Sequence, residues 1–265
     1  MNVKRPLSFF ALIVLCAIVL SCDSSHDAEP QVKLTPVSMK DADHKIDLTH
    51  ASDGKLQFIR YTNYYPNDVV LTGIVEYIYG QDGRLEKTIT DSGDGFVFHY
   101  EGDRIASTDE YIGDEIVEQH TFTYDDRGRL ADWISWQDIP EEGGHIPVKK
   151  YTYRYDGNDN LTENKIYYYA SGEHDFKLLS IITFSDYDTR PNAEDHFERH
   201  AFNPIVVLRK NNPGKLISTN AAGLGKSESI FSYSYDKFGY PSRKVTTTLE
   251  NDQQYTSTID YVFEE

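Results

Sequence analysis

The sequence predicts an all-β fold: a single, strongly curved antiparallel meander of consecutive hairpins, forming a barrel or a half-barrel. Three observations support this prediction. The chain has 20 Tyr and 13 Phe but only 2 Met and 2 Trp, and tyrosine and phenylalanine favour the half-buried surface of a sheet. Short stretches alternate between apolar and polar residues, as strands do. Each stretch leads into a turn rich in Asp, Asn and Gly, and this unit recurs along the chain.

Residues 1–21 are interpreted as a signal peptide. Two basic residues precede an apolar run over residues 7–20, and the run ends at Ser21-Cys22. The segment resembles a bacterial lipoprotein signal with its lipobox, which implies diacylation of the Cys22 thiol and cleavage after Ser21. An ordinary cleaved signal and an uncleaved anchor are the alternatives, but the run is shorter than the roughly 20 residues that span a bilayer. We therefore expect attachment to a membrane through the lipid on Cys22 only.

Net charge and cysteine content limit which partners and which covalent cross-links the chain can have. Loss of Lys4 and Arg5 with the signal takes the formal net charge from −17 to −19, two positive charges fewer. Such a charge repels nucleic acid and anionic membrane surfaces, so we expect no nucleic-acid partner. Cys16 leaves with the signal and Cys22 carries the lipid, so no disulfide forms. Residues 22–50, polar and without a sustained period, are interpreted as the lipidated cysteine and a flexible tether, and residues 51–265 as one β domain.

The turn chemistry explains the repeated unit. The Asp that ends a strand accepts a hydrogen bond from the backbone two residues on, Gly or Asn adopts the positive φ of the turn, and the following Leu or Ile returns to the core. Such units lie at residues 77–85, 96–105, 122–130, 151–161 and 231–241.

One unit also shows how the two faces of the sheet divide. Tyr151, Tyr153 and Tyr155 share one face, while Lys150 and Arg154 lie on the other. Charge on that outer face excludes contact with lipid, because Arg or Lys at the bilayer midplane costs about 2 to 4 kcal/mol.

One stretch departs from the strand pattern. Residues 192–202 begin with an Asn cap and acidic residues, and Ala193, Phe197 and Ala201 follow helical spacing. We expect a short helical excursion there, ended by Asn203-Pro204. The apolar residues 205–208 are expected to be buried, either as a strand or as an extension of the excursion.

Two resemblances follow from these motifs. The Tyr-Asp turns resemble the YD repeats of Rhs-type shell proteins and teneurins, without their self-cleaving core or toxin tip. Residues 187–192, 210–216, 233–241 and 255–261 resemble, in this order, a Bacteroidota family of lipoproteins and secreted proteins of unknown function with a porin-like fold. This second resemblance implies a curved antiparallel meander and no known activity. It also implies a cell-envelope location on the outer membrane, facing the periplasm or the outside.

Several local motifs suggest chemistry but fit it poorly. His196 and His200 have the spacing of two metal ligands on a helix, but Phe197 stands where a zinc protease has its Glu. Residues 220–227 nearly match a phosphate-binding loop, yet a strand follows them instead of a helix. Residues 156–160 lack the Gly and Glu that complete a calcium loop. We therefore expect no metal site and no cofactor, and no nucleophile motif indicates an enzyme.

Aromatic side chains are the remaining candidates for a site. Trp133 and Trp136 are three residues apart, so in a strand they lie on opposite faces and at most one of them belongs to a given core. With Tyr151, Tyr153 and Tyr155 they form the predicted ligand-binding set, for a carbohydrate or a small apolar compound. Packing in the core is the simpler explanation for each ring.

The sequence thus favours a lipid-anchored, non-catalytic envelope protein that binds a ligand or a partner. The alternative is an envelope glycan hydrolase with a carboxylate pair in the concave face. A component of a YD-type toxin delivery or immunity system is a third hypothesis.

Overall fold

The computed structural model describes residues 34–140, 144–192, 194–197, 199–250 and 253–264. Its sixteen strands are β1 (Thr35–Lys40), β2 (His44–His50), β3 (Leu56–Tyr65), β4 (Val69–Tyr79), β5 (Leu85–Thr90), β6 (Gly95–Glu101), β7 (Arg104–Ile112), β8 (Glu115–Tyr124), β9 (Leu130–Ile139), β10 (Gly144–Tyr155), β11 (Leu161–Ala170), β12 (Asp175–Ser185), β13 (Lys215–Asn220), β14 (Ser227–Tyr235), β15 (Pro241–Glu250) and β16 (Gln253–Glu264). The helical elements are a 3₁₀ turn, η2 (Ser171–Glu173), and α1 (Glu194–Phe197). Among these described segments, no helix is long and apolar enough to cross a membrane.

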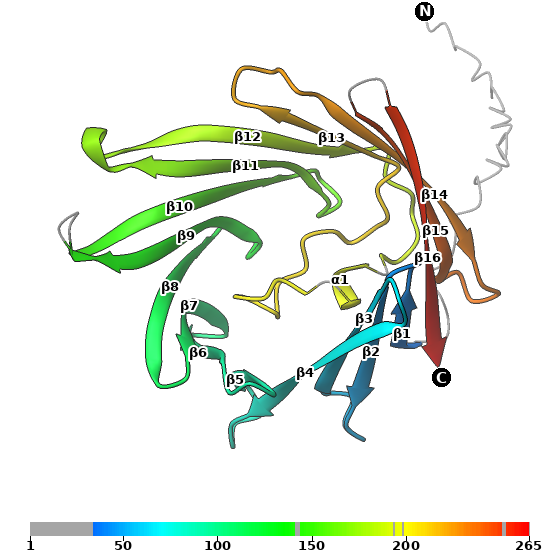
Figure 1. Ribbon diagram of the computed structural model, residues 1–265, viewed down its shortest axis with the longest axis horizontal. Helices are drawn as coiled ribbons and strands as arrows, with labels where there is room; N and C mark the ends of the chain where they lie inside the picture. Colours follow the sequence, from blue (N-terminus) through cyan, green and yellow to red (C-terminus); the bar gives the residue numbers. More distant parts are fainter. Residues whose placement is uncertain (1–33, 141–143, 193, 198, 251–252, 265) are drawn as a thin grey trace, which may run out of the picture.

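The strands form one closed antiparallel barrel (Figure 1). Every strand pairs with its neighbours in sequence, and β1 pairs with β16 from Thr35↔Glu264 to Lys40↔Asp260 to complete the ring. The predicted all-β meander is therefore confirmed, and the sheet closes fully. A sixteen-stranded barrel encloses more space than inward-facing side chains can fill, so something further must occupy or line its interior.

The barrel begins earlier than the sequence analysis placed it. The prediction of a tether over residues 22–50 is wrong for its later part, because β1 and β2 occupy residues 35–40 and 44–50. In β2, Ile46 and Leu48 join the core, while Lys45 and Asp47 form an ion pair at 2.8 Å on the outer face. The alternation in β2 is short, and the turn between β1 and β2 at residues 41–43 contains no Gly. In the sequence this hairpin is therefore hard to distinguish from a polar linker. The signal peptide and Cys22 lie outside the described residues.

The Tyr-Asp turn at residues 124–129 folds as the repeated unit predicts, whereas in the turn at residues 156–160 the positive φ belongs to Asp159 rather than to Gly or Asn. Asp125 accepts hydrogen bonds from the N–H groups of Arg127 and Arg129, at 3.0 and 2.9 Å. Gly128 has a φ of 84°, which suits Gly and strains other residues. The guanidinium of Arg129 then lies over the ring of Tyr155, 4.8 Å from its centroid. The Tyr155 hydroxyl donates to a carbonyl of the preceding hairpin at 2.9 Å.

The same contact joins other neighbouring hairpins. Lys55 lies over Tyr79 and Arg104 lies over Tyr124, at 5.2 Å in both cases. Each tyrosine also donates its hydroxyl to a backbone carbonyl of the hairpin before it. The recurrence of Tyr, Asp, Arg and Leu therefore has a structural cause, since these residues tie successive hairpins together at one end of the barrel.

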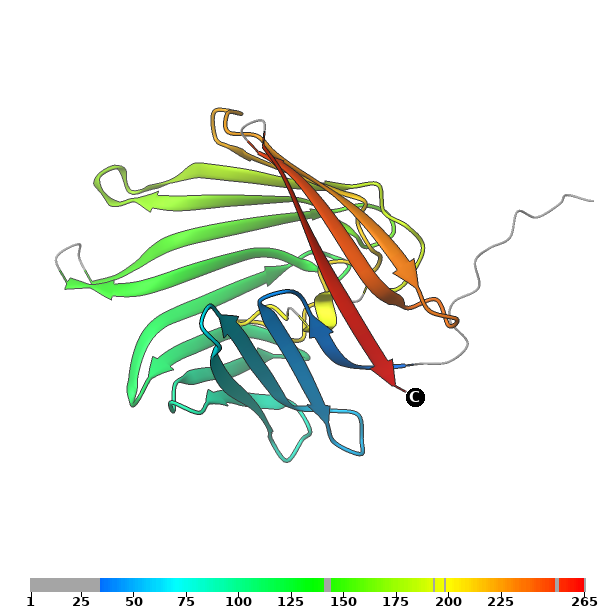
Figure 2. The same ribbon diagram turned by 45° about the vertical axis from the view of Figure 1, so that its right-hand side comes forward.

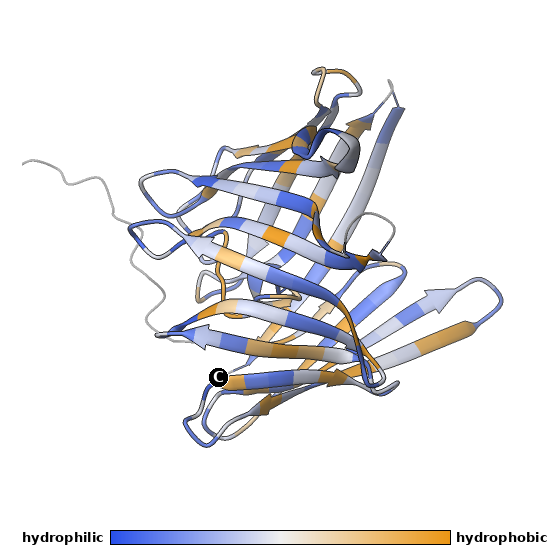
Figure 3. Cartoon of the chain, turned by 90° about the vertical axis from the view of Figure 1, so that its left-hand side faces the viewer, coloured by the Kyte–Doolittle hydropathy of each residue, from blue (hydrophilic) through white to orange (hydrophobic). Residues whose placement is uncertain are grey.

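The two faces of the sheet differ as predicted. In β10 the three alternate tyrosines face inward, whereas Lys150 and Arg154 face outward and pair with Asp132 at 3.3 Å and Glu163 at 3.5 Å. Hydrophilic and hydrophobic stretches alternate along the strands in Figure 3. The outer face of β10 is thus charged at Lys150 and Arg154.

The loop between β12 and β13, residues 186–214, turns back into the barrel and crosses its interior (Figures 1 and 2). We call this segment the plug. It enters from the end that carries the Tyr-Asp turns, which we call the plugged end. The opposite end is the open end.

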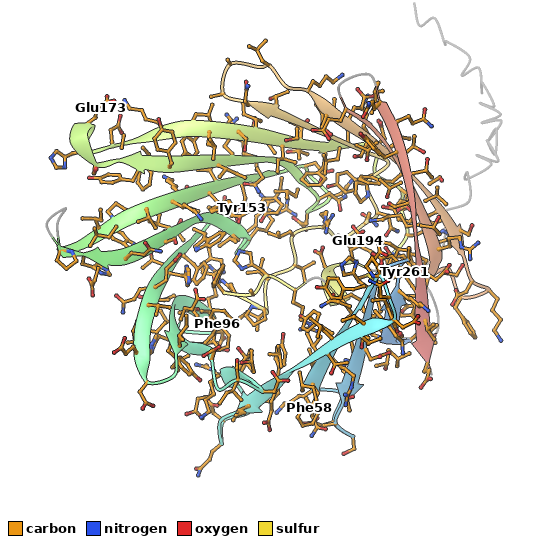
Figure 4. The ribbon with its side chains drawn as sticks, viewed as in Figure 1. Phe58, Phe96, Tyr153, Glu173, Glu194 and Tyr261 are labelled. Carbon is orange, nitrogen blue, oxygen red and sulfur yellow. The ribbon has the colours of Figure 1, made fainter. Side chains whose placement is uncertain are left out.

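A buried ionic cluster, the plug latch, fixes the plug to the barrel wall. Glu194 of the plug accepts hydrogen bonds from Lys244 of β15 and from Arg209 of the plug, the latter at 3.2 Å. Arg209 also binds Asp195 through two nitrogens, at 3.2 and 2.9 Å. Lys244 and Glu194 are only 7% and 5% exposed. Figure 4 shows Glu194 beside the inward-facing Tyr261 of β16.

Buried asparagines close the base of the plug. Asn160 and Asn211 exchange two hydrogen bonds, at 3.1 and 2.8 Å, although they lie 51 residues apart. Asn212 donates to Asp188 and to the carbonyl of Pro191. The motifs at residues 187–192 and 210–216 therefore hold the two ends of the plug together.

The helical excursion in the plug is shorter than the sequence suggested. Asn192 caps it as predicted, because its side-chain oxygen accepts from the N–H of Glu194 at 3.0 Å. The helix α1 then covers only Glu194–Phe197, and residues 199–202 are not helical. Residues 205–208 form neither strand nor helix, and the expectation that they are buried is wrong for Ile205 and Val207, which are 44% and 62% exposed. Asp195 accounts for the lack of regular structure, since its carboxylate binds the N–H groups of Leu208 and Arg209 and replaces regular backbone pairing.

Candidate functional site

Beyond the plug, the interior of the barrel is open to solvent. Strand register places a set of large side chains on the inner face towards the open end. These are Tyr61 (36% exposed), Tyr65 (49%), Val69 (48%), Leu71 (55%), Tyr168 (46%) and Tyr255 (54%). Inward-facing side chains with this exposure show that the barrel wall is not covered there. We call this solvent-open part of the interior the cup.

A group of polar and aromatic residues lies on the cup wall across β7 to β10. Register aligns Glu110 of β7 with Glu118 of β8, and His120 of β8 with Ser135 of β9. Trp133 of β9 pairs with Tyr151 of β10. We call the group consisting of Glu110, Glu118, His120, Trp133, Ser135, Gln137 and Tyr151 the inner-wall site.

The aromatic part of the inner-wall site is a stacked pair of rings. Trp133 and Tyr151 lie 4.1 Å apart between centroids, with an angle of 12° between their planes. Two plug residues, His200 and Phe202, contact the same indole with centroids 5.0 Å away. Trp133 and Tyr151 remain half-buried rather than fully enclosed. The plug therefore supports the ring pair without covering it completely.

The acidic part consists of two facing glutamates. Ser135 and Gln137 both donate to Glu118, with Gln137 Nε2 at 2.7 Å from Oε2. The side chains of Glu110 and Glu118 are 30% and 20% exposed. Burial, and secondarily the charge of Glu118, raises the pKa of Glu110 above its usual value. Glu118 is thus held by neutral donors, whereas Glu110 is protonated more easily than a solvent-exposed glutamate.

His120 connects the rings to the acids. Its Nδ1 accepts a hydrogen bond from the Trp133 indole N–H at 3.1 Å, so in the neutral ring Nε2 carries the proton. Nε2 faces Glu110 Oε2 at 3.5 Å and has no hydrogen-bond partner among the described residues. The residue is completely buried. Burial, together with His200, lowers the pKa of His120 to about 3, which keeps the imidazole neutral.

The predicted aromatic set is divided between four environments. Trp133 and Tyr151 belong to the inner-wall site, whereas Tyr153 is 8% exposed in the core and Tyr155 seals a turn at the plugged end. Figure 4 shows Tyr153 within the ring of strands. Trp136 lies on the outer face, stacked on His145 at 5.5 Å. The expectation that the two tryptophans lie on opposite faces is confirmed.

Sequence reasoning did not single out Glu110, Glu118 or His120. The sequence does contain one relevant signal. The Gly113-Asp114 turn predicts a hairpin, and its two strands carry Glu110 on one side and Glu118 and His120 on the other. A bulge at Val117 shifts the register, so that Glu110 faces Glu118 rather than Val117. Because a bulge has no clear sequence pattern, the pairing of Glu110 with Glu118 could not be predicted.

The weaker motifs take structural roles. Asn220 accepts from the N–H groups of Ala222 and Leu224 in a hairpin turn, as expected for residues 220–227. Asp156 likewise accepts hydrogen bonds from the N–H groups of Asn158 and Asn160, in the turn between β10 and β11. His200 lies beyond the end of α1. The part of the chain that the structure describes contains no group of three or more potential metal ligands.

Comparison with known proteins shows the fold. No family model and no curated protein matches the sequence. Among solved structures, a porin-like protein from Bacteroides uniformis is similar over 87% of this chain and 96% of its own, with a TM-score of 0.60 and 12% identity. A porin-like protein from Bacteroides vulgatus is similar over 87% and 98%, with a TM-score of 0.52 and 14% identity. The chain has a porin-like barrel fold. At this level of identity the likeness extends to the fold alone.

Proposed function

We propose that this protein is a lipid-anchored protein of the cell envelope, belonging to the Bacteroidota family that its motifs resemble, whose cup binds a carbohydrate without transforming it. The observation that supports binding most directly is the half-buried Trp133–Tyr151 stack beside two carboxylates on a wall open to solvent. An aromatic face packs against the C–H face of a sugar ring, and carboxylates accept hydrogen bonds from its hydroxyls. Such a combination of one apolar surface with a few directed polar groups is typical of ligand sites.

The facing glutamates also bring the hydrolase alternative into consideration. Cross-strand neighbours have Cβ atoms about 4.5 to 5.5 Å apart, near the carboxylate spacing of retaining glycosidases. However, glycosidase carboxylates flank the scissile bond from two sides. Glu110 and Glu118 project from adjacent strands of one wall, so both reach the same side of a bound sugar. This geometry favours recognition over cleavage.

Titration of tryptophan fluorescence tests binding, because the two tryptophans lie on opposite faces. In a Trp136→Phe variant, Trp133 is the sole tryptophan, and a bound sugar should change its emission. Measured by isothermal titration calorimetry, Trp133→Leu should weaken binding of any tetrasaccharide that the wild type binds by about tenfold or more, as loss of a central aromatic contact does. Trp136→Leu is the matched control and should keep wild-type affinity.

The outcomes separate the two candidate functions. Equal affinity in the Trp133→Leu and Trp136→Leu variants would argue against the inner-wall site as the binding site. Release of new reducing ends from the same tetrasaccharides, abolished by Glu118→Gln, would establish the hydrolase instead.

The lipid anchor on Cys22 is part of the proposal. The first described strand begins at Thr35, at the plugged end, so an anchor upstream of it would leave the cup uncovered. Cys22→Ala should abolish incorporation of labelled fatty acid and release the protein from the membrane fraction, because the polar residues after Cys22 supply no apolar anchor. Membrane association of the unlabelled variant would contradict this assignment.

A further inference from the structure

The acids of the inner-wall site lack a cationic partner. Among the described residues, neither Glu110 nor Glu118 forms an ion pair with Lys or Arg, and their charged-group contacts are with His120 alone. His120 is neutral, as its lowered pKa shows. Two like charges opposite each other on neighbouring strands destabilise a sheet. Among the described residues the two carboxylates therefore have no direct cationic contact, although the register also places Lys149, opposite Ser135, on the same inner wall.

The acidic groups of the plug latch, by contrast, have cationic partners. Glu194 contacts both Lys244 and Arg209, and Asp195 contacts Arg209. On the outer face, Asp132 and Glu163 likewise pair with lysine or arginine. The facing acid pair of the inner-wall site thus differs from these four carboxylates.

A buried donor also points at the acid pair. His120 Nε2 lies 3.5 Å from Glu110 Oε2 and lacks a hydrogen-bond partner, although the residue has no exposed surface. An unpaired buried donor costs free energy. A shift of the Glu110 carboxylate by a few tenths of an ångström towards His120 would satisfy it. His120 is therefore placed to orient Glu110, as Ser135 and Gln137 orient Glu118.

We infer that the inner-wall site selects a ligand bearing a protonated primary amine, whose ammonium group lies between Glu110 and Glu118 while its ring packs on Tyr151, the half of the ring pair that Phe202 and His200 do not contact. An ammonium has three donors and no acceptor, which complements two carboxylates that already have donors on their inner sides. The adjacent aromatic faces favour a cation further. An amino sugar has this chemistry. The inference rests on the proposed function and specifies the ligand class of the same site.

A matched pair of ligands tests the ammonium group separately from the sugar. Methyl 6-amino-6-deoxy-α-glucoside and methyl α-glucoside differ only in an ammonium in place of a hydroxyl. The Trp136→Phe protein, titrated at pH 7 with Trp133 fluorescence as the readout, should bind the amine about 10 to 100 times more tightly, the range expected for a charge-assisted hydrogen bond. Glu118→Gln should reduce this preference to nearly one.

Asp109→Asn provides the matched control. Asp109 precedes Glu110 but lies on the outer face, where it contacts His99 and Gln119. This variant should keep the full preference for the amine. Its far-ultraviolet circular dichroism and that of Glu118→Gln should match the wild type, since both substitutions keep the size of the side chain.

Each outcome has a distinct meaning. Equal affinity of the Trp136→Phe protein for the two glucosides would overturn the ammonium inference while leaving carbohydrate binding in place. If neither glucoside binds, phenethylamine supplies the ammonium and an aromatic ring without a sugar. Binding of phenethylamine that Glu118→Gln abolishes would support the inference and contradict the carbohydrate proposal. No binding of any of the three probes would overturn both.

Discussion

Lys244→Met should destabilise the protein by about 3 to 5 kcal/mol, as expected when one partner of a buried ion pair is removed. Lys244 is 7% exposed and contacts Glu194, which is 5% exposed. Without the ammonium, Glu194 retains only Arg209, whose guanidinium also binds Asp195. A net negative charge would then remain buried between the plug and the wall.

Denaturant unfolding in a double-mutant cycle measures this effect. Lys244→Met combined with Glu194→Gln removes both charges, so the double variant should be destabilised by clearly less than the sum of the single variants. Arg243→Met is the control, because Arg243 is the neighbour that faces outward and forms an exposed ion pair with Asp260 at 2.6 Å. Exposed pairs contribute about 0 to 1 kcal/mol. Additive losses in the cycle would show that the plug latch is not a coupled unit.

Local chemistry made most of the barrel predictable. The Asp and Gly of each Tyr-Asp turn act within a few residues, as Asp125 and Gly128 do, so their effect can be derived from the sequence. The two-residue alternation of each strand then assigns side chains to the inner or the outer face of the sheet. It correctly placed Trp133 and Trp136 on opposite faces. The wrong boundary at residue 50 arose where these signals weaken, because the β1–β2 turn uses Asp41 in place of a Gly.

Long-range contacts account for what the sequence did not predict. Closure depends on β1 meeting β16, and the plug depends on contacts such as Asn160 with Asn211. Neither contact has a local pattern. The plug latch likewise joins Glu194 to Lys244, 50 residues later. The sequence therefore indicated an excursion near residues 192–202 without showing that it fills the barrel.

The inner-wall site was predicted only in its aromatic half. Trp133 and Tyr151 follow from composition and alternation, because large rings on one face are visible in the sequence. Glu110 and Glu118 become neighbours through the bulge at Val117. A regular hairpin would have placed Glu118 on the other face. The role of His120 depends in turn on Trp133 and Glu110, which lie on two different strands.

Lowering the pH from 7 to 5 should destabilise the protein through two buried histidines, His120 and His200. Burial lowers the pKa of His200 to about 4, and burial together with His200 lowers the pKa of His120 to about 3. In the unfolded chain both have a pKa of about 6.5. Below about pH 6.5 both imidazoles are protonated in the unfolded state but remain neutral in the folded state. The free energy of unfolding therefore falls as the pH decreases. The loss begins near pH 7 and ends near the folded pKa values.

At pH 5 each histidine should contribute a loss of about 2 kcal/mol, which makes this one of the two largest effects we expect. Urea unfolding at pH 7 and pH 5 measures it. Aspartates with lowered pKa values, such as Asp125, reduce stability only at lower pH, because unfolded Asp titrates near 3.9. His200→Phe should remove roughly half of the difference, since a phenyl ring can keep the contacts of His200 with Phe122 and Trp133. His145→Phe changes an outer-face histidine and should leave the difference in place. A wild-type protein equally stable at both pH values would show that these imidazoles accept protons in the folded barrel.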